Sequence, residues 1–169
     1  MLTNGDLPYA AGSWSYSHKE IKVKRLIAAS FLAVLAGCAS HGKSDEAIYR
    51  EAADAHVMTL PAGQTKVSLV ATKILSHGLI GDNLAIAAGG GANAMQLKQQ
   101  LQMAKTVDDT GFLIIGAGTS LDVAVIKNAF ESLDLNGMRI YYAGGENQKE
   151  AVRSAVEKAR AKFQFISVQ

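Results

Sequence analysis

Three short glycine-rich segments are the part of the sequence best suited to bind a small anionic or polar ligand. Glycine lets the backbone approach a ligand closely, and a helix that begins after such a turn offers free N–H groups to an anion. The glycines are Gly89, Gly90, Gly91, Gly116, Gly118, Gly144 and Gly145. The polar side chains beside them are Asn93, Thr119, Ser120, Asp122, Glu146 and Asn147. Together these residues are the candidate ligand loops.

A purely structural role is the competing interpretation of the same segments. Tight turns between strands and helices favour glycine, Thr119 or Ser120 is a usual N-cap, and Asp122 is favourable in a first helical turn. The dinucleotide pattern GxGxxG is incomplete, because Ala94 and Leu121 occupy its third glycine positions. The chain has no Gly-Lys-Ser/Thr motif and no acidic residue at ribose-binding distance. The sequence therefore does not favour a nucleotide, and we expect no cofactor.

Other residues that could do chemistry are isolated. His41, His56 and His77 form no HxxxH or HExxH pair, so we expect no metal site. Ser120 follows Gly118-Thr119 and does not complete the GxSxG of a nucleophile elbow. The single cysteine excludes an intramolecular disulfide framework and a cysteine-based zinc cluster. These absences favour a non-enzymatic role and leave the enzyme class open.

The elements that must position the glycine turns alternate from residue 82 onward. The predicted strands are 84–88, 112–115, 139–142 and 163–168, and the predicted helices between them are 93–105, 120–133 and 147–162. Leu84, Phe112 and Ile140 are 28 residues apart, the length of one strand–helix unit. Continuous apolar strands flanked by amphipathic helices indicate an α/β fold, a small open sandwich with about four parallel strands. All three glycine turns are then expected at the carboxyl edge of the sheet, where such folds bind ligands.

The segment before residue 82 is predicted to contribute one or two helices. The first is 45–57, with Ser44 or Asp45 as its N-cap. Residues 67–75 place apolar side chains at helical spacing, but a strand at 65–71 is the competing interpretation because its apolar residues also alternate. Residues 38–44 are mostly small and polar and are predicted to be a tether. Residues 45–169 are expected to form a single α/β domain.

The N-terminal region has the layout of a secretory signal peptide. The basic cluster 22–25 precedes an apolar run of about a dozen residues, which is too short to cross a bilayer. The segment Leu35-Ala36-Gly37-Cys38 follows and contains the only cysteine of the chain. This segment resembles the lipobox of bacterial lipoproteins, whereas no family is identified for the rest of the chain. A buried N-terminal helix with an incidental cysteine is the competing interpretation.

The resemblance implies that residues 23–37 are a lipoprotein signal peptide and that Cys38 becomes the first residue of the mature protein. Its thiol accepts a diacylglyceryl group, and in a Gram-negative cell the residue carries three acyl chains. Several chains anchor a protein stably where a single chain is marginal. In enteric bacteria Asp after the cysteine favours inner-membrane retention, so Ala39 favours the outer membrane. We therefore expect a lipid anchor at Cys38 on the periplasmic face of the outer membrane.

Residues 1–22 do not fit a signal peptide, which normally starts within a few residues of its basic cluster. Our hypothesis is a start codon placed too early, with translation beginning at Val23. Lys19-Glu20 can be encoded as a ribosome-binding sequence, which supports that start. A genuine extension or an expression scar is the alternative.

Composition and charge narrow the function classes. The chain is 49% hydrophobic and 19% charged, which is typical of a globular protein. From Cys38 onward 13 Lys and Arg residues balance 13 Asp and Glu residues, so charge gives no argument for nucleic acid. The leading hypothesis is a non-enzymatic lipoprotein, an accessory or structural subunit of a secretion, conjugation, pilus or similar assembly, with an envelope protein as partner. The alternative is a periplasmic small-ligand-binding or enzymatic domain that uses the glycine-rich loops.

Overall fold

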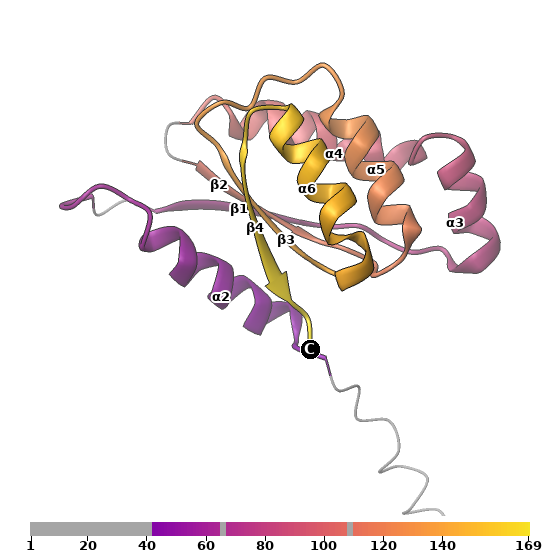
Figure 1. Cartoon of the computed structure of the whole chain (residues 1–169), viewed down its shortest axis with the longest axis horizontal. Helices are drawn as coiled ribbons and strands as arrows, with labels where there is room; N and C mark the ends of the chain where they lie inside the picture. Colours follow the sequence, from indigo (N-terminus) through magenta and orange to yellow (C-terminus); the bar gives the residue numbers. More distant parts are fainter. Residues whose placement is uncertain (1–41, 65–66, 108–109) are drawn as a thin grey trace, which may run out of the picture. The chain divides into compact units, whose positions relative to one another are not determined.

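Four parallel strands form the sheet in the described part of the chain, which comprises residues 42–64, 67–107 and 110–169 of a computed structural model (Figure 1). The strands are β1 (Ser68–Lys73), β2 (Thr110–Ile115), β3 (Arg139–Gly144) and β4 (Lys162–Ser167). The helices are α2 (Asp45–Val57), α3 (Gly78–Ala87), α4 (Gly91–Ala104), α5 (Ser120–Phe130), the short 3-10 helix η2 (Glu146–Gln148) and α6 (Lys149–Lys158). The predicted α/β class with about four parallel strands is confirmed.

The strands lie side by side in their order along the chain, β1-β2-β3-β4. Right-handed connections between strands in this order place all the connecting helices on the same face of the sheet. Accordingly α4 packs against α5, and α5 packs against α6. Helix α2 contacts all four strands and lies on the opposite side of the sheet from α5 and α6 (Figure 1). The sheet is therefore covered by several helices on one face and by α2 on the other.

Each face of the sheet builds its own hydrophobic core. Along β2, Phe112 and Ile114 belong to the core beneath α4, α5 and α6, while Leu113 belongs to the core beneath α2. Ile48 and Ala52 are the buried residues through which α2 closes this second core. Because successive side chains of a strand point to opposite faces, a strand covered on both faces must be apolar throughout. All six residues of β2 are buried.

The first predicted strand was wrong. Residues 84–88 lie at the end of α3 and just after it, and β1 supplies the fourth strand. A short apolar run does not distinguish a strand from a helix, and the alanines of this run favour a helix. The helix predicted at 67–75 was wrong too, and β1 confirms the competing strand from residue 68 onward, whereas residues 65 and 66 lie outside the described residues. Valine and threonine residues in this stretch favour a strand.

The other predicted elements are confirmed with small shifts of their ends. Ser44 is the N-cap of α2, and its side chain accepts a hydrogen bond from the Ala47 N–H at 3.2 Å. Helix α5 ends three residues before the predicted 133, and Ser132 takes a left-handed φ of 63° there. Phe112 and Ile140, 28 residues apart, are direct neighbours in the register of β2 and β3. The spacing thus reflects one strand–helix unit.

Candidate functional site

Two of the three glycine-rich segments lie beside each other at the carboxyl edge of the sheet, as predicted. Gly116 directly follows β2, and its N–H donates to the Ala143 carbonyl of β3 at 2.7 Å. Gly144 ends β3, and Gly145 leads from it into η2. The structure therefore brings together the loops at 116–118 and 144–145.

The third glycine-rich segment does not follow a strand, which corrects the prediction. The element before these glycines is the helix α3, so Gly89 and Gly90 link α3 to α4, and Gly91 is the first residue of α4. Gly90 has a φ of +91°, and a Cβ added there would lie 2.6 Å from the Cα of Val125 in α5. This segment therefore serves close helix packing. Asn93 does reach the sheet edge, because its amide donates to the Leu75 carbonyl just after β1 at 3.1 Å.

The loop after β2 closes around the carboxylate of Asp122, which is fully buried in the first turn of α5. The Ala117 N–H donates to Asp122 Oδ1 at 2.8 Å, and the Gly118 N–H donates to Oδ2 at 3.0 Å. The Tyr142 hydroxyl of β3 also donates to Oδ2, at 2.7 Å. We call this arrangement the Asp122 clasp. The two loop N–H groups that could bind an anion are thus already bonded to the protein's own carboxylate.

The electrostatics of the Asp122 clasp follow from its burial. Burial raises the pKa of Asp122, against the opposing effect of the hydrogen bonds from Tyr142, Ala117 and Gly118, and the charge of Asp82 raises it further. Burial and the neighbouring carboxylate likewise raise the pKa of the Tyr142 hydroxyl. The Asp122 carboxyl group also occupies the Ala117 and Gly118 N–H groups that an anion would need. The clasp therefore weighs against the anionic ligand predicted for this loop.

The remaining polar residues of the candidate loops have structural contacts or lie in solvent. Thr119 is the N-cap of α5, and its hydroxyl accepts a hydrogen bond from the Leu121 N–H at 3.3 Å. Glu146 forms an ion pair with Lys149 at 2.7 Å. Ser120 and Asn147 are exposed. The strand-end loops therefore present no convergent set of polar groups to a ligand.

A second aspartate holds the loop after β1 in a similar way. Asp82 of α3 accepts a hydrogen bond from the Ser76 hydroxyl at 2.6 Å and from the His77 N–H at 2.8 Å. These two hydrogen bonds lower the pKa of Asp82. Asp82 is also the one buried residue of α3. Of the apolar residues of α3, only Ala85 and Ile86 pack against the core, and both are half-buried.

The large apolar residues on the outer side of α3 face solvent, unlike the half-buried Ala85 and Ile86. Leu79, Ile80 and Leu84 are 80%, 87% and 73% exposed. Their exposed neighbours on and just after α3 are Asn83, Ala87 and Ala88, and we call these six residues the α3 surface. An exposed apolar patch of this kind marks an interaction site more often than isolated exposed side chains do. Sequence reasoning missed this surface because it assigned residues 84–88 to a strand.

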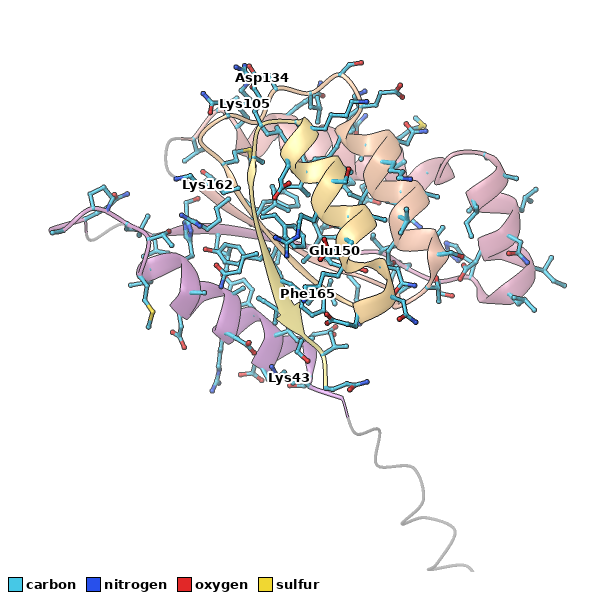
Figure 2. All side chains as sticks on the ribbon, in the orientation of Figure 1. Lys43, Lys105, Asp134, Glu150, Lys162 and Phe165 are labelled. Carbon is cyan, nitrogen blue, oxygen red and sulfur yellow. The ribbon has the colours of Figure 1, made fainter. Side chains whose placement is uncertain are left out.

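The α3 surface carries no charge. Between His77 and Lys98 the only charged residue is Asp82, which is turned inward. Charged side chains gather elsewhere: Lys105 and Asp134 lie near each other at the end of the helix layer, away from α3 (Figure 2). Asp134 forms an ion pair there with Arg160. This charge-free stretch was the signal in the sequence that could have identified the surface.

Hollows also occur in the described residues away from the strand-end loops. An open groove of about 890 Å³ runs over α5 and is lined by Ile86, Lys127 and Lys158 among others. A small polar pocket of about 80 Å³ lies near the start of β3 and β4, where His56 and Arg139 line it. No group of three His, Cys, Asp or Glu residues able to hold a metal ion occurs within the described ranges.

Cys38, the predicted site of lipid attachment, lies outside the described residues. None of the helices from residue 42 onward that the structure describes is long and apolar enough to cross a membrane. No protein-family model, curated protein or solved structure matches this chain.

Proposed function

We propose that this chain is a lipid-anchored bacterial envelope lipoprotein whose α/β domain is a non-enzymatic accessory or structural subunit. Cys38 carries the anchor at the periplasmic face of the outer membrane. The domain contacts a protein partner in an envelope assembly such as a secretion, conjugation or pilus system. The single observation that carries the docking role is the exposed, uncharged α3 surface.

The anchor is supported by the order of segments before the domain. A basic cluster, an apolar run and Leu35-Ala36-Gly37-Cys38 follow one another, and only three residues separate Cys38 from Gly42. Helix α2 begins at Asp45, so a folded domain starts directly after this short tether. Ala39 supports sorting to the outer membrane by analogy with enteric lipoproteins.

The docking role is supported by the way α3 is built. Globular proteins place the apolar face of a helix in the core, whereas α3 buries an aspartate and exposes two leucines and an isoleucine. The centres of protein interfaces are depleted of charge, as the α3 surface is. The strand-end loops offer less to a ligand, because the amides of Ala117 and Gly118 are bonded to Asp122. A protein contact is therefore the better-supported role.

The anchor is tested by growing cells that express the full chain with labelled palmitate. We expect label in the wild-type chain and none in Cys38→Ser, with the labelled chain in the outer-membrane fraction. Ala39→Asp is the matched control for sorting in an enteric host, and it should keep the label and move to the inner membrane. A wild-type chain without label contradicts the proposed anchor.

The docking role is tested by native electrophoresis of envelopes dissolved in mild detergent. We expect the wild-type chain to migrate in a complex larger than one chain and Ile80→Glu to migrate as a single chain. Gln102→Glu, the same charge on an exposed position of α4, is the matched control and should leave the complex intact. A wild-type chain that migrates alone and retains a small molecule in native mass spectrometry favours the ligand-binding alternative.

A further inference from the structure

The exposed side of α3 has a spacing that fits the same helix in a second copy. At 100° per residue, Ile80, Leu84 and Ala87 project within a sector of about 60°, with Asn83 beside them. All four residues are exposed. If two copies of α3 lie antiparallel with the two-fold axis between residues 83 and 84, Ile80 of one copy reaches the height of Ala87 of the other. Leu84 then lies close to Leu84.

This arrangement places a large side chain against a small one at each end and two leucines together near the axis. Ile80, at 87% exposure, meets the small Ala87, and Leu84, at 73% exposure, meets its own copy near the axis. In a two-fold interface the same patch serves both subunits, so it must be complementary to itself. For a patch that is large at one end and small at the other, the antiparallel arrangement sets the large end of one copy against the small end of the other.

The charge distribution also fits a second copy. Self-association of a charged patch brings like charges together, and that repulsion is the usual penalty of a two-fold contact. Gly78 to Leu97 contains no charge apart from Asp82, which accepts its hydrogen bonds from Ser76 and the His77 N–H within the same chain. A partner recognised by charge gains nothing from this surface, whereas a second copy meets no repulsion.

We propose that the α3 surface pairs with the α3 surface of a second copy of this chain, in an antiparallel two-fold contact centred between Asn83 and Leu84. The inference rests on the proposed role of α3 as a docking surface and does not depend on the lipid anchor. It makes the protein a dimer whose two domains are related by a two-fold axis between the two copies of α3.

Disulfide trapping in whole cells tests the pairing with the full chain. Two copies with different C-terminal tags are co-expressed, both carrying Asn83→Cys, and the cells are oxidised before lysis. Near the axis the two Asn83→Cys thiols are within disulfide reach, so we expect a dimer that carries both tags. Ala88→Cys is the matched control on the same helix. It lies about 14 Å from its own copy along the helix, so its dimer yield should be at least tenfold lower.

A second variant tests the apolar contact itself. Ile80→Glu combined with Asn83→Cys should reduce the dimer yield at least tenfold, and resistance of the domain to protease verifies that it is folded. The pairing is overturned if Asn83→Cys gives no dimer, if its product carries only one tag and a different protein, or if Ala88→Cys gives an equal yield. The chain without an added cysteine tests the anchor separately, because a disulfide through Cys38 shows a free thiol. That outcome contradicts acylation and leaves the comparison of Asn83→Cys with Ala88→Cys intact.

Discussion

The loop and helix after β2 and the loop and helix after β1 occupy equivalent places in the topology but differ in how they use apolar residues. In both, a buried aspartate early in the helix accepts a backbone N–H of the loop that follows the strand. Helix α5 lies in the middle of the helix layer and buries six residues. Helix α3 follows the edge strand β1 and buries only Asp82. The same hydrogen bond from a loop N–H to an aspartate thus occurs before a core helix at the centre of the sheet and before an exposed apolar helix at its edge.

The difference shows that position in the sheet, more than local sequence, decides the role of an apolar helix. Helix α5 lies over the core that includes Phe112 and Ile140, so its apolar face is covered. Helix α3 contacts α4 and α5 and leaves Leu79 and Ile80 in solvent. Surface that the fold itself does not cover is available to a partner. Substitutions on the two sides of this comparison should therefore have very different effects on folding.

The largest expected effect is that of Gly90→Val, on the inner side of the junction between α3 and α4. Its φ of +91° disfavours any side chain, and a Cβ would meet the Val125 Cα at 2.6 Å. We expect the free energy of unfolding to fall by more than about 4 kcal/mol, measured by urea denaturation followed by circular dichroism.

Gly91→Ala is the control for backbone strain alone. Gly91 also has a positive φ, of +56°, but no atom lies within 4 Å of an added Cβ. We expect a cost of about 1–2 kcal/mol. Equal costs for the two variants contradict the close packing of this junction against α5. Loss of function in Gly90→Val would accordingly reflect loss of folding, so this variant does not test ligand binding.

The next largest effect is expected from Asp122→Ala. The substitution leaves the buried Tyr142 hydroxyl without its acceptor, and it also removes the acceptor of the partly buried hydrogen bonds from the Ala117 and Gly118 N–H groups. Each unsatisfied buried donor costs about 1–3 kcal/mol, so we expect a loss of about 3 kcal/mol in the free energy of unfolding after relaxation. Asp82→Ala, which removes the acceptor of the Ser76 hydroxyl and the His77 N–H, should cost less because both donors belong to exposed residues. If Asp82→Ala lowers the free energy of unfolding more than Asp122→Ala does, the greater burial of the Asp122 clasp is not what sets its contribution.

A smaller effect is expected in the pH dependence of stability, to which Asp122 and Asp82 contribute with opposite sign. Because the pKa of Asp122 is raised in the folded protein, its contribution to stability is full below the unfolded pKa of about 3.9 and is lost as the pH rises through the folded pKa. The pKa of Asp82 is lowered, so its contribution is present above about 3.9 and is lost as the pH falls through the folded pKa.

Urea denaturation of wild type, Asp122→Asn and Asp82→Asn from about pH 3.5 to about pH 7 measures this difference. The stability of wild type relative to Asp122→Asn should rise as the pH falls. The stability of wild type relative to Asp82→Asn should decline over the same range. If both relative stabilities change in the same direction with pH, the opposite pKa shifts of Asp122 and Asp82 are contradicted.

The sequence was sufficient to predict the strands at the centre of the sheet, but it was not sufficient to predict the helix at its edge. Strand β2 is apolar at nearly every position, so its double burial was predictable, and Phe112 and Ile140 lie in register as their spacing indicated. The helix at Leu84 was not predictable from its apolar run, because its length and pattern fit a strand equally well. Tertiary position decided it, since β1 already fills the edge of the sheet. The residues of the ligand loops were located correctly around Gly116 and Gly144, but nothing local indicated that Asp122 would occupy the loop amides.

The smallest expected effect on folding is that of Ile80→Ser, and it is the most direct test of the comparison. Ile80 is 87% exposed, so replacing it should change the free energy of unfolding by no more than about 0.5 kcal/mol. The same substitution at Ile126 of α5, which is fully buried, removes a core side chain and buries a hydroxyl, and should cost about 3 kcal/mol or more. Urea denaturation of both variants measures the contrast. If Ile80→Ser destabilises the isolated chain as much as Ile126→Ser does, α3 is covered by its own chain and has no surface to offer a partner. If folding is unchanged while the large complex in mild detergent is lost, Ile80 is retained for a contact outside its own chain, because the fold gains nothing from an exposed isoleucine.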